Sequence, residues 1–387
     1  MTGGGSGGHI TPILAIADEL KRRDPDTQII YIGQKGDTLA DLPARSPDID
    51  AVYSVSAGKL RRYADEGWRQ LLNVRVQLLN IRDVFRTLAG LWQSYWLLRT
   101  LQPDVIFSRG GFVSVPVTLG GHLSGVPYVT HDSDSVPSLA NRLIARWAHT
   151  HAVALPIEMY PYPAAKTVQV GVPVSSKYQP VTPALRERYR KALGLKYKQI
   201  VFLTGGGNGA RALNEGMVAN VRYLLGTFPE LAIVHVAGRA HETGVSAAYD
   251  ALQLGAARDR VQVHGFVHDL YQYSGAADVV VSRSGATTLA EFAAQGLACI
   301  VVPAAQLGWD VKNAQALADR GAVIKLSGDQ VEQPERLGRT IGDLLSDELR
   351  REKIAHTFAS YARPHAAADL ADMLCKIGGE KRVRPKK

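Results

Sequence analysis

Short apolar runs, many of them β-branched, alternate with helical patterns along most of this chain. The strand-like runs cover residues 28–32, 104–107, 128–130, 199–204, 232–237, 261–264, 278–282 and 299–303. Near-continuous apolar runs of this kind suit parallel strands whose two faces are both covered by helices. The pattern therefore predicts an α/β protein built from parallel βαβ units.

This alternation lapses once, where prolines accumulate between about residues 155 and 183. Proline clusters interrupt regular structure, so they mark the best domain boundary. We predict a first domain over residues 1–158, a linker over 159–183 and a second domain over 184–345. Helices over residues 346–377 have no strand after them, so they cap the second domain or return to the first, and residues 378–387 form a basic tail.

One helical stretch, residues 68–98, carries an apolar stripe at alternating spacings of three and four residues. This spacing predicts a helix with one apolar face. Trp68, Trp92 and Trp96 lie in it, with arginines interleaved. We interpret most of the stripe as core. The alternative is a membrane-facing surface, because basic amphipathic helices that carry tryptophan also rest on anionic lipid.

Positive charge is concentrated in two places. The chain has a net charge of +9, and residues 59–109 hold nine basic residues against four acidic ones. Residues 376–387 hold six basic residues against one acidic one. Such clusters indicate a partner with phosphate groups, although ordinary solvated surfaces also carry them.

Composition excludes several classes of protein. Cys299 and Cys375 are the only cysteines, too few for a disulfide framework or a cysteine zinc site. We find no apolar stretch of about 18 residues, the length that a spanning helix requires. We also find no basic and apolar leader at the start, so the sequence predicts a cytosolic protein with a soluble body.

Glycine-rich loops open both predicted domains, at residues 3–9 and 205–209, and each leads into a helical pattern. The second loop follows a strong strand and matches G-x-G-x-x-A, so its amides and the helix N-terminus suit a phosphate. A tight turn without a ligand is the alternative. In the first loop, Thr11 and Pro12 predict a helix start. Only Met1 and Thr2 precede this loop, so we expect a strand to be encoded upstream.

Further polar segments follow other predicted strands. They cover residues 109–114, 131–134, 282–288 and 306–313, with Asn141 and Glu291 in the helical patterns that follow two of them. The carboxyl ends of parallel strands are where α/β sheets place ligands. A histidine beside two acids can indicate a metal, but a single turn segment is too little for a metal site, and we predict none.

Five of these segments, taken together and in chain order, resemble the MurG family, the UDP-N-acetylglucosamine–N-acetylmuramyl-(pentapeptide) pyrophosphoryl-undecaprenol N-acetylglucosamine transferases. They are residues 3–12, 109–114, 131–141, 205–211 and 283–291. The resemblance covers about residues 3–376. It implies a GT-B fold, in which two Rossmann-like parallel-sheet domains face a cleft. It also implies inverting transfer of GlcNAc from UDP-GlcNAc to lipid I, giving lipid II for peptidoglycan synthesis.

The same resemblance implies the partners and the site residues. The partners are a UDP-sugar, a polyprenyl-diphosphate-linked acceptor and the anionic cytoplasmic face of the cell membrane, with no nucleic acid and no required cofactor. The implied donor-binding residues are Gly206, Gly207, Asn208, Arg283, Ser284, Gly285, Thr287, Thr288, Glu291, Trp309, Asp310 and Asn313. The implied acceptor-binding residues are Ser6, Gly7, Gly8, Gly110, Gly111, Phe112, His131 and Asn141.

Several positions depart from the family pattern. They are Phe112 for a tyrosine, Asp134 for an asparagine, Ser175 for an arginine, Gly207 for a serine, and Trp309 with Asp310 for paired glutamines. An amide cannot accept a proton at neutral pH, whereas a carboxylate can. We therefore predict Asp134 as the general base, with His9 as the alternative.

Two other functions remain open from the sequence. The first is transfer of a sugar from a UDP-sugar to diacylglycerol or another lipid. The second is a non-catalytic nucleotide-sugar-binding subunit that docks on a membrane. A dinucleotide-dependent dehydrogenase is disfavoured, because its fingerprint needs one glycine loop with an acidic residue about 20 positions on, not paired loops in two halves.

Overall fold

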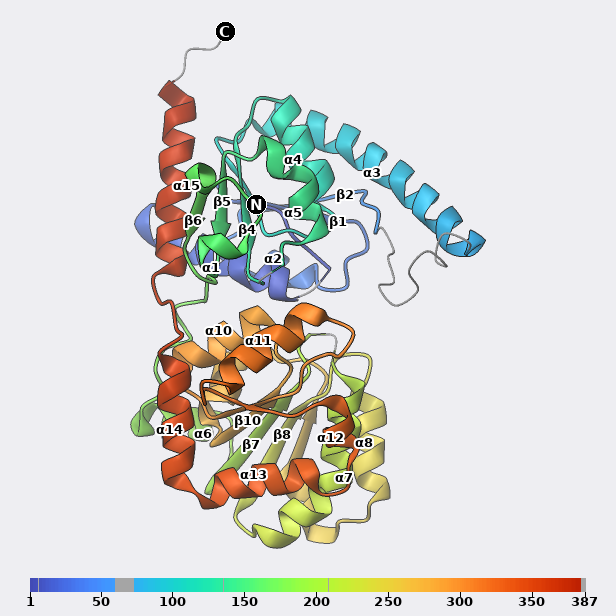
Figure 1. The fold of residues 1–387 in the computed structure, drawn as a ribbon, viewed down its shortest axis with the longest axis vertical. Helices are drawn as coiled ribbons and strands as arrows, with labels where there is room; N and C mark the ends of the chain where they lie inside the picture. The colour runs from blue at the N-terminus through green and yellow to red at the C-terminus, as the bar shows by residue number, and fades with distance from the viewer. Residues whose placement is uncertain (6, 60–72, 135, 208, 384–387) are drawn as a thin grey trace. The chain divides into compact units, whose positions relative to one another are not determined.

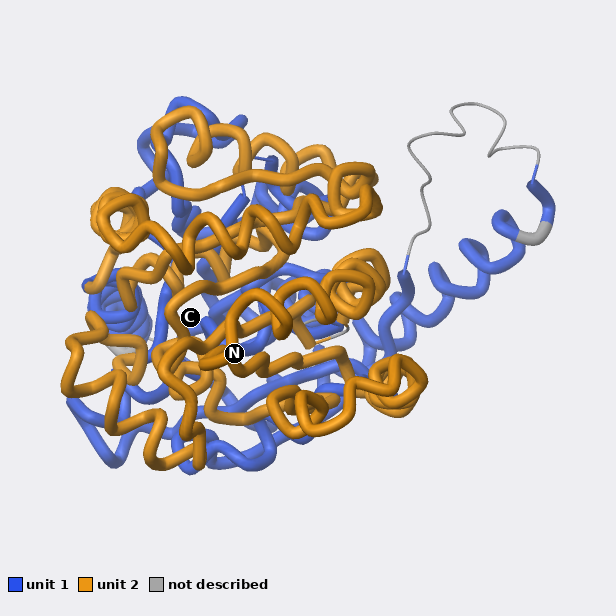
Figure 2. Tube along the Cα trace, turned by 90° about the horizontal axis from the view of Figure 1, so that it is seen from below, with its two compact units in different colours: residues 1–175, 365–387 blue, residues 176–364 orange. Residues whose placement is uncertain are grey.

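The computed structural model describes residues 1–5, 7–59, 73–134, 136–207 and 209–383. The chain forms two compact units, which Figure 2 shows in different colours. Unit 1 contains residues 1–175 and 365–387, and unit 2 contains residues 176–364. Each unit is built around a parallel sheet covered by helices on both faces, as the apolar runs predict (Figure 1).

The sheet of unit 1 is parallel throughout. Its strands are β1 (Ile30–Gln34), β2 (Ala51–Val55), β3 (Ile106–Ser108), β4 (Tyr128–Asp132), β5 (Thr150–Val153) and β6 (Thr167–Gln169). Met1 and Thr2 lie between β1 and β3. The Ile32 amide donates to the Met1 carbonyl at 2.9 Å, and the Thr2 amide donates to the Phe107 carbonyl at 2.8 Å. These two residues therefore join β1 and β2 to the other four strands.

Helices from both ends of the chain cover one face of this sheet. Residues of α1 (Gly7–Arg23) and α15 (Ala366–Val383), among them Ile13 and Leu370, share one apolar cluster with β1 and β3. The predicted helical stretch 346–377 thus divides, since α14 (Glu348–Ala359) packs in unit 2 through Phe358. The other face carries α3 (Val74–Leu101), α4 (Ser114–Leu123) and α5 (Leu139–Ile144), and a short α2 (Asp41–Ala44) follows β1.

The start of α1 differs from the prediction. Thr11 and Pro12 lie inside the helix rather than at its start, because α1 begins at Gly7. The Thr11 hydroxyl donates to the Gly7 carbonyl at 3.2 Å, which is a bond within a helix. The prediction of the helix start was wrong, because the glycines that suggested an open loop form the first turn.

Unit 2 contains a six-stranded parallel sheet with the order β12-β11-β10-β7-β8-β9. The strands are β7 (Gln199–Thr204), β8 (Leu231–Val236), β9 (Val261–His264), β10 (Val279–Ser282), β11 (Cys299–Val301) and β12 (Ile324–Lys325). One face packs against α7 (Arg211–Thr227), α8 (Glu242–Ala251), α12 (Gly328–Glu332) and α13 (Arg336–Ser346). The other face packs against α6 (Pro183–Ala192), α9 (Leu270–Ala276), α10 (Ala286–Gln295), α11 (Gly308–Ala318) and α14.

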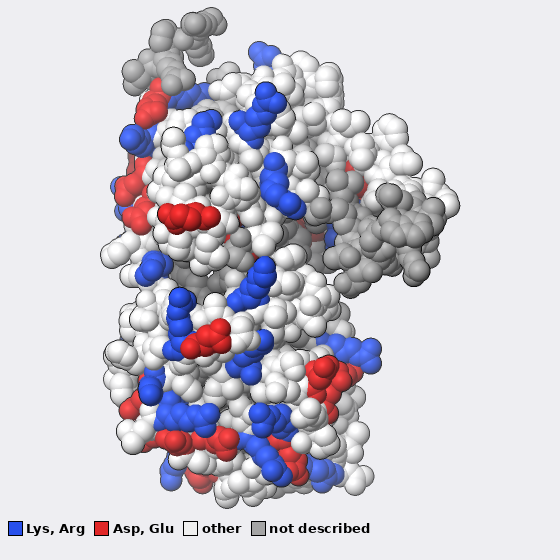
Figure 3. All heavy atoms as spheres, in the orientation of Figure 1, with Lys and Arg blue, Asp and Glu red and all other residues white. Residues whose placement is uncertain are grey.

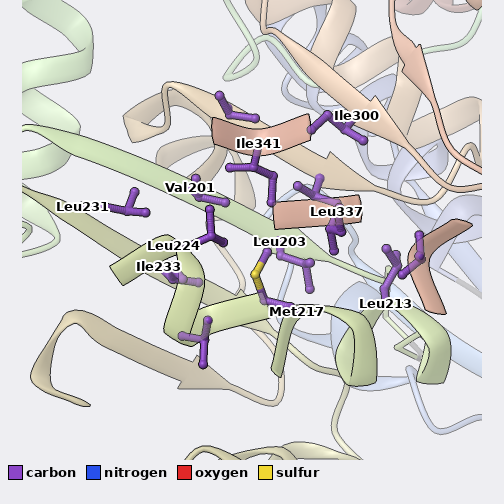
Figure 4. Close-up of a cluster of buried hydrophobic side chains, with 14 of the residues drawn as sticks. Val201, Leu203, Leu213, Met217, Leu224, Leu231, Ile233, Ile300, Leu337 and Ile341 are labelled. Atoms are coloured by element: carbon purple, nitrogen blue, oxygen red, sulfur yellow. The ribbon is translucent and has the colours of Figure 1, made fainter. Parts of the chain in front are cut away.

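Buried side chains of the central strand hold these layers together. Val201 and Leu203 on β7 point toward Met217 on α7 and toward Leu337 and Ile341 on α13 (Figure 4). All five are fully buried, and burying such a side chain contributes about 1.5–3 kcal/mol. This core fixes the strand ends from which the loops of the sheet emerge.

The apolar stripe of α3 is not core. Most of its large side chains face solvent, including Phe85, which is 67% exposed, and Trp92, which is 65% exposed. The helix packs on α4 and the sheet with its opposite side, where Val76, Ser94 and Leu98 are buried. The interpretation of the stripe as core was therefore wrong for the described residues. Trp68 lies outside them.

Candidate active site

Three loops of unit 2, which follow β7, β10 and β11, begin at the same edge of its sheet. Since β10 pairs with both β7 and β11, the loops that follow these strands are neighbours. The N-termini of α7, α10 and α11 follow the same three loops. Helix N-termini carry partial positive charge and unpaired amides, so this edge suits a diphosphate.

The loop after β7 can be built only with glycine at two positions. A side chain on Gly209, whose φ is +74°, would place its Cβ 2.2 Å from the Ala237 carbonyl oxygen. A Cβ on Gly205 would lie 2.3 Å from the Ala210 nitrogen. Gly206 and Gly207 are half-buried in this loop, and Asn208 lies outside the described residues. The close fit leaves no room for a side chain at Gly205 or Gly209.

Two of the predicted donor loops are joined to each other through Asp310. Its carboxylate forms an ion pair with Arg283 at 3.3 Å, and its carbonyl accepts a hydrogen bond from the Ser284 hydroxyl at 3.0 Å. Asp310 and Ser284 are buried, whereas Trp309 is exposed. The Asp310 carboxylate therefore already has a partner. Its contact with a sugar stays a prediction.

The remaining predicted donor residues lie on the helices that follow these loops. Gly285 is the N-cap of α10, Thr287 is buried in the first turn of that helix, and Thr288 is half-buried beside it. Asn313 is half-buried on α11. These residues are thus on the elements that bear the loops, and their ligand contacts remain predictions.

Glu291 is a buried carboxyl group with one hydrogen-bond partner that the sequence did not reveal. Its side chain lies on α10, is 5% exposed and is hydrogen-bonded to Tyr178. Burial raises the pKa of Glu291 to about 8, and the bond from the phenol opposes this shift. Tyr178 precedes α6 and meets the Tyr271 ring edge-on, with 6.1 Å between ring centroids. The proline pattern assigned Tyr178 to a linker and gave no sign of this contact.

The loops of unit 1 converge in the same way. A Cβ on Gly111, whose φ is +81°, would lie 3.0 Å from the Gly4 carbonyl oxygen and 3.3 Å from Nδ1 of His9. A Cβ on Gly110 would lie 3.1 Å from the Ser138 hydroxyl. A Cβ added to Gly5 would likewise meet the Phe112 ring, and one added to Gly110 would meet the Asn141 amide. The structure thus brings together most of the residues predicted on the acceptor side. Gly7 and Gly8 begin α1 here, and Ser6 lies outside the described residues.

His9 has a defined proton arrangement. Its Nδ1 lies 2.8 Å from the Gly4 carbonyl oxygen. Because a carbonyl only accepts, Nδ1 carries the hydrogen and Nε2 carries the lone pair. Burial, and then the positive charge of Arg109, lower the pKa of His9 to about 4. The ring is therefore neutral at neutral pH, the form that can accept a proton.

Side chains at the end of β4 are hydrogen-bonded to other parts of unit 1. His131 is fully buried, and its Nε2 donates to the Gly171 carbonyl at 2.8 Å. Asn141 donates through Nδ2 to the His131 carbonyl at 3.0 Å. The carboxylate of Asp132 accepts a bond from the Tyr162 hydroxyl at 2.7 Å, and burial raises its pKa. Asp134 is half-buried and lies within electrostatic reach of Arg109.

Two negative findings apply to the described residues alone. Within them, no group of three or more histidine, cysteine, aspartate or glutamate side chains is arranged to hold a metal ion. None of the helices in the same part of the chain combines the length and apolar composition needed to cross a membrane.

Each of the two units matches a model of a known protein family. A profile described as the glycosyltransferase family 28 N-terminal domain matches residues 1–153, and one described as the C-terminal domain matches residues 200–371. A relative from Moorella thermoacetica is 31% identical over 381 residues, covering 97% of this chain and 98% of its own length. It is named UDP-N-acetylglucosamine–N-acetylmuramyl-(pentapeptide) pyrophosphoryl-undecaprenol N-acetylglucosamine transferase. The chain belongs to the MurG family.

Solved structures confirm the predicted class of fold. The MurG structure from Acinetobacter baumannii aligns with a TM-score of 0.67 at 23% identity, covering 97% of this chain and 98% of that one. The UDP-GlcNAc 2-epimerase from Neisseria meningitidis, bound to UDP-GlcNAc, aligns with a TM-score of 0.61 at 12% identity, covering 95% and 97%. An epimerase shares this architecture. The fold alone therefore does not separate sugar transfer from epimerisation, and the MurG family membership rests on sequence identity.

Proposed function

We propose that this chain transfers GlcNAc from UDP-GlcNAc to the N-acetylmuramyl-(pentapeptide) pyrophosphoryl-undecaprenol acceptor, lipid I, and so forms lipid II. The observation that carries the proposal is the match at about 30% identity, over nearly the whole length, to MurG relatives named for this reaction. The loops at the sheet edge of unit 2 support it, because they offer helix N-termini to a diphosphate and Glu291 to a ribose.

The chemistry requires a proton acceptor and a site for developing negative charge. The acceptor hydroxyl attacks the anomeric carbon of GlcNAc from the side opposite UDP, so the configuration inverts. Its proton passes to a basic group, for which His9 and Asp134 are the candidates. UDP leaves with negative charge, which amides at helix N-termini such as those of α7 and α10 can stabilise. The proposal includes no metal ion or other cofactor.

A matrix of donors and acceptors tests the reaction. UDP-GlcNAc, UDP-glucose and UDP-galactose are each incubated with a lipid I analogue or with diacylglycerol, and UDP release and product mass are recorded. We expect product only with UDP-GlcNAc and the lipid I analogue. A diacylglycerol product instead indicates the other lipid transferase, and UDP binding without any product indicates the non-catalytic subunit.

We also propose that α3 docks unit 1 on the anionic cytoplasmic face of the cell membrane. Its exposed apolar side chains are Val74, Leu78, Ile81, Val84, Phe85, Leu88, Trp92 and Trp96. Helix α3 extends beyond the body of unit 1 (Figures 1 and 2), and its visible surface is mostly free of charged side chains (Figure 3). Arg82, Arg86 and Arg99 are exposed on the same helix, although Arg82 and Arg86 share the buried Asp83. This combination of apolar area with basic charge suits anionic lipid.

Vesicle binding should depend on the apolar side chains of α3. Replacing Phe85 and Trp92 together by glutamate should abolish flotation with phosphatidylglycerol vesicles, because the helix loses insertion area and gains charge repelled by the lipid. Leu349→Glu is the matched control, since this residue is 80% exposed on α14 of unit 2. Equal flotation of the double variant, or equal binding to phosphatidylcholine and phosphatidylglycerol vesicles, would contradict the docking proposal.

A further inference from the structure

A buried network of hydrogen bonds in unit 2 runs from α8 through β8 to α7. His235 on β8 lies at its centre. Nδ1 of His235 is 2.9 Å from the Tyr249 hydroxyl on α8, and Nε2 is 3.0 Å from Oδ1 of Asn214 on α7. Nδ2 of Asn214 then donates to the Ala237 carbonyl at 3.0 Å. All three side chains are buried, so the network ties the two helices to the end of the strand inside the core.

The hydrogens of this network have one consistent arrangement. A carbonyl oxygen only accepts, so the Ala237 carbonyl fixes Nδ2 of Asn214 as the donor and leaves Oδ1 as an acceptor. Nε2 of His235 must therefore carry the hydrogen. Burial lowers the pKa of His235 to about 4, so the ring is neutral at neutral pH and its Nδ1 accepts the Tyr249 hydroxyl. An apolar side chain in place of His235 or Asn214 would break this arrangement.

The Ala237 carbonyl is also a surface on which the glycine loop after β7 packs. A Cβ on Gly209 would lie 2.2 Å from this oxygen and 2.9 Å from Cδ2 of His241. Gly209 directly precedes Ala210, the N-cap of α7, and the Asn214 amide donates to the Ala210 carbonyl at 3.0 Å. The bond from Asn214 to Ala237 therefore joins the start of α7 to the same carbonyl that meets the loop.

We infer that Asn214, held in place by His235 and Tyr249, is a positioning residue for the donor diphosphate. The inference rests on the proposed function, because it takes the loop after β7 to be the one that meets this diphosphate. Hydrogen bonds from amides weaken steeply when their angle or distance changes, so a loop that binds phosphate needs a fixed place. Asn214 provides it by anchoring the start of α7 to the end of β8.

A second asparagine on α7 shows what a merely structural amide would do. Asn220 is also buried, its Nδ2 donates to the Gly216 carbonyl at 2.7 Å, and its Oδ1 accepts the Gly338 amide at 3.0 Å. These bonds join α7 to α13 and not to the glycine loop. Leucine at either position should lower the Tm, because each change leaves buried polar groups unsatisfied. Only the change at Asn214 should alter how the protein binds phosphate.

The test compares UDP with uridine, which has the same base and ribose but no diphosphate. Isothermal calorimetry gives the Kd for UDP, and competition against UDP gives the Kd for uridine. Asn214→Leu should weaken UDP binding about 10-fold, the order of one lost hydrogen bond, and leave uridine binding almost unchanged. His235→Leu should act in the same direction, whereas His235→Gln should keep the UDP affinity because its amide has both a donor and an acceptor. Asn220→Leu is the matched control and should change neither affinity.

Equal losses of UDP and uridine affinity in Asn214→Leu, or no loss of either, would overturn the inference. If this variant does not fold, nuclear magnetic resonance of the unaltered protein decides. The Nε2 hydrogen of His235 and the side-chain amide of Asn214 should then shift on addition of UDP but not of uridine. The same shifts with both ligands, or none, would also overturn the inference. Absence of UDP binding by the unaltered protein is a separate result, since it would contradict the proposed function itself.

Discussion

UDP should bind the Glu291→Gln variant about 10- to 150-fold more weakly than the unaltered chain at pH 8.5. An ionised carboxylate accepts hydrogen bonds from both ribose hydroxyls. This contributes about 1.5–3 kcal/mol more to binding than a neutral group, which accepts such bonds less well. Glutamine keeps the size of the side chain, so the loss reports charge rather than shape. Isothermal calorimetry with UDP measures it, and equal affinities would remove Glu291 from the donor site.

The pH dependence of UDP binding provides a sharper version of this test. The pKa of Glu291 is about 8, so its carboxyl group is mostly protonated at pH 7 and must lose that proton to accept both hydroxyls. The affinity for UDP should therefore rise between pH 7 and 9. The second ionisation of a phosphate lies near pH 6, below this range, so it does not explain the rise. The Glu291→Gln variant should show no such rise. Tyr178→Phe should move the midpoint to higher pH, because the phenol bond favours the carboxylate.

The Glu291→Gln substitution should also stabilise the fold. The folded state holds the Glu291 proton up to about pH 8, whereas an unfolded chain releases it near pH 4.5. Between these values the unfolded state binds fewer protons, so this group makes stability fall as pH rises. Glu291→Gln should thus raise the Tm at pH 8 while weakening UDP binding. Glu348→Gln, an exposed acid on α14, is the control and should change neither.

Apolar runs predicted most of the strands, including the edge strand β9, but missed the buried interior strand β5. All eight predicted runs overlap observed strands, and the bounds of β7 and β9 agree fully. The strands without such a run were missed, namely β2, β5, β6 and β12. Three of these lie at sheet edges, and β2 exposes Val52 and Tyr53, so their sequences lack the continuous apolar pattern. An edge strand needs only one neighbour, and its side chains are free to be polar.

The candidate active site was also only partly predictable from the sequence. Polar residues after strands predicted which loops meet, because parallel topology alone places them at one sheet edge. Specific partners were not predictable. Tyr178 and Glu291 lie far apart in sequence, and the ion pair between Arg283 and Asp310 spans 27 residues. Periodicity likewise predicted that α3 is amphipathic, but it does not specify whether the apolar face meets core, water or lipid.

Asp134→Asn should lower kcat by about 10²- to 10⁴-fold, the usual contribution of a general base. The carboxylate stands at a position where the family pattern has an amide, follows β4 and is near Arg109. Asparagine keeps its shape and most of its hydrogen bonding but cannot take a proton. UDP affinity should barely change, because the predicted donor residues belong to unit 2 and Asp134 to unit 1.

Comparison with His9 decides which group takes the proton. If Asp134 is the base, His9→Gln should keep the acid limb of the pH–rate profile, whereas Asp134→Asn should remove it. The exposed Asp26→Asn serves as a control in the same unit and should keep full activity. Near-normal kcat in Asp134→Asn would exclude Asp134 as the base. Proton transfer would then fall to His9, whose Nε2 carries the lone pair because Nδ1 is bound to the Gly4 carbonyl.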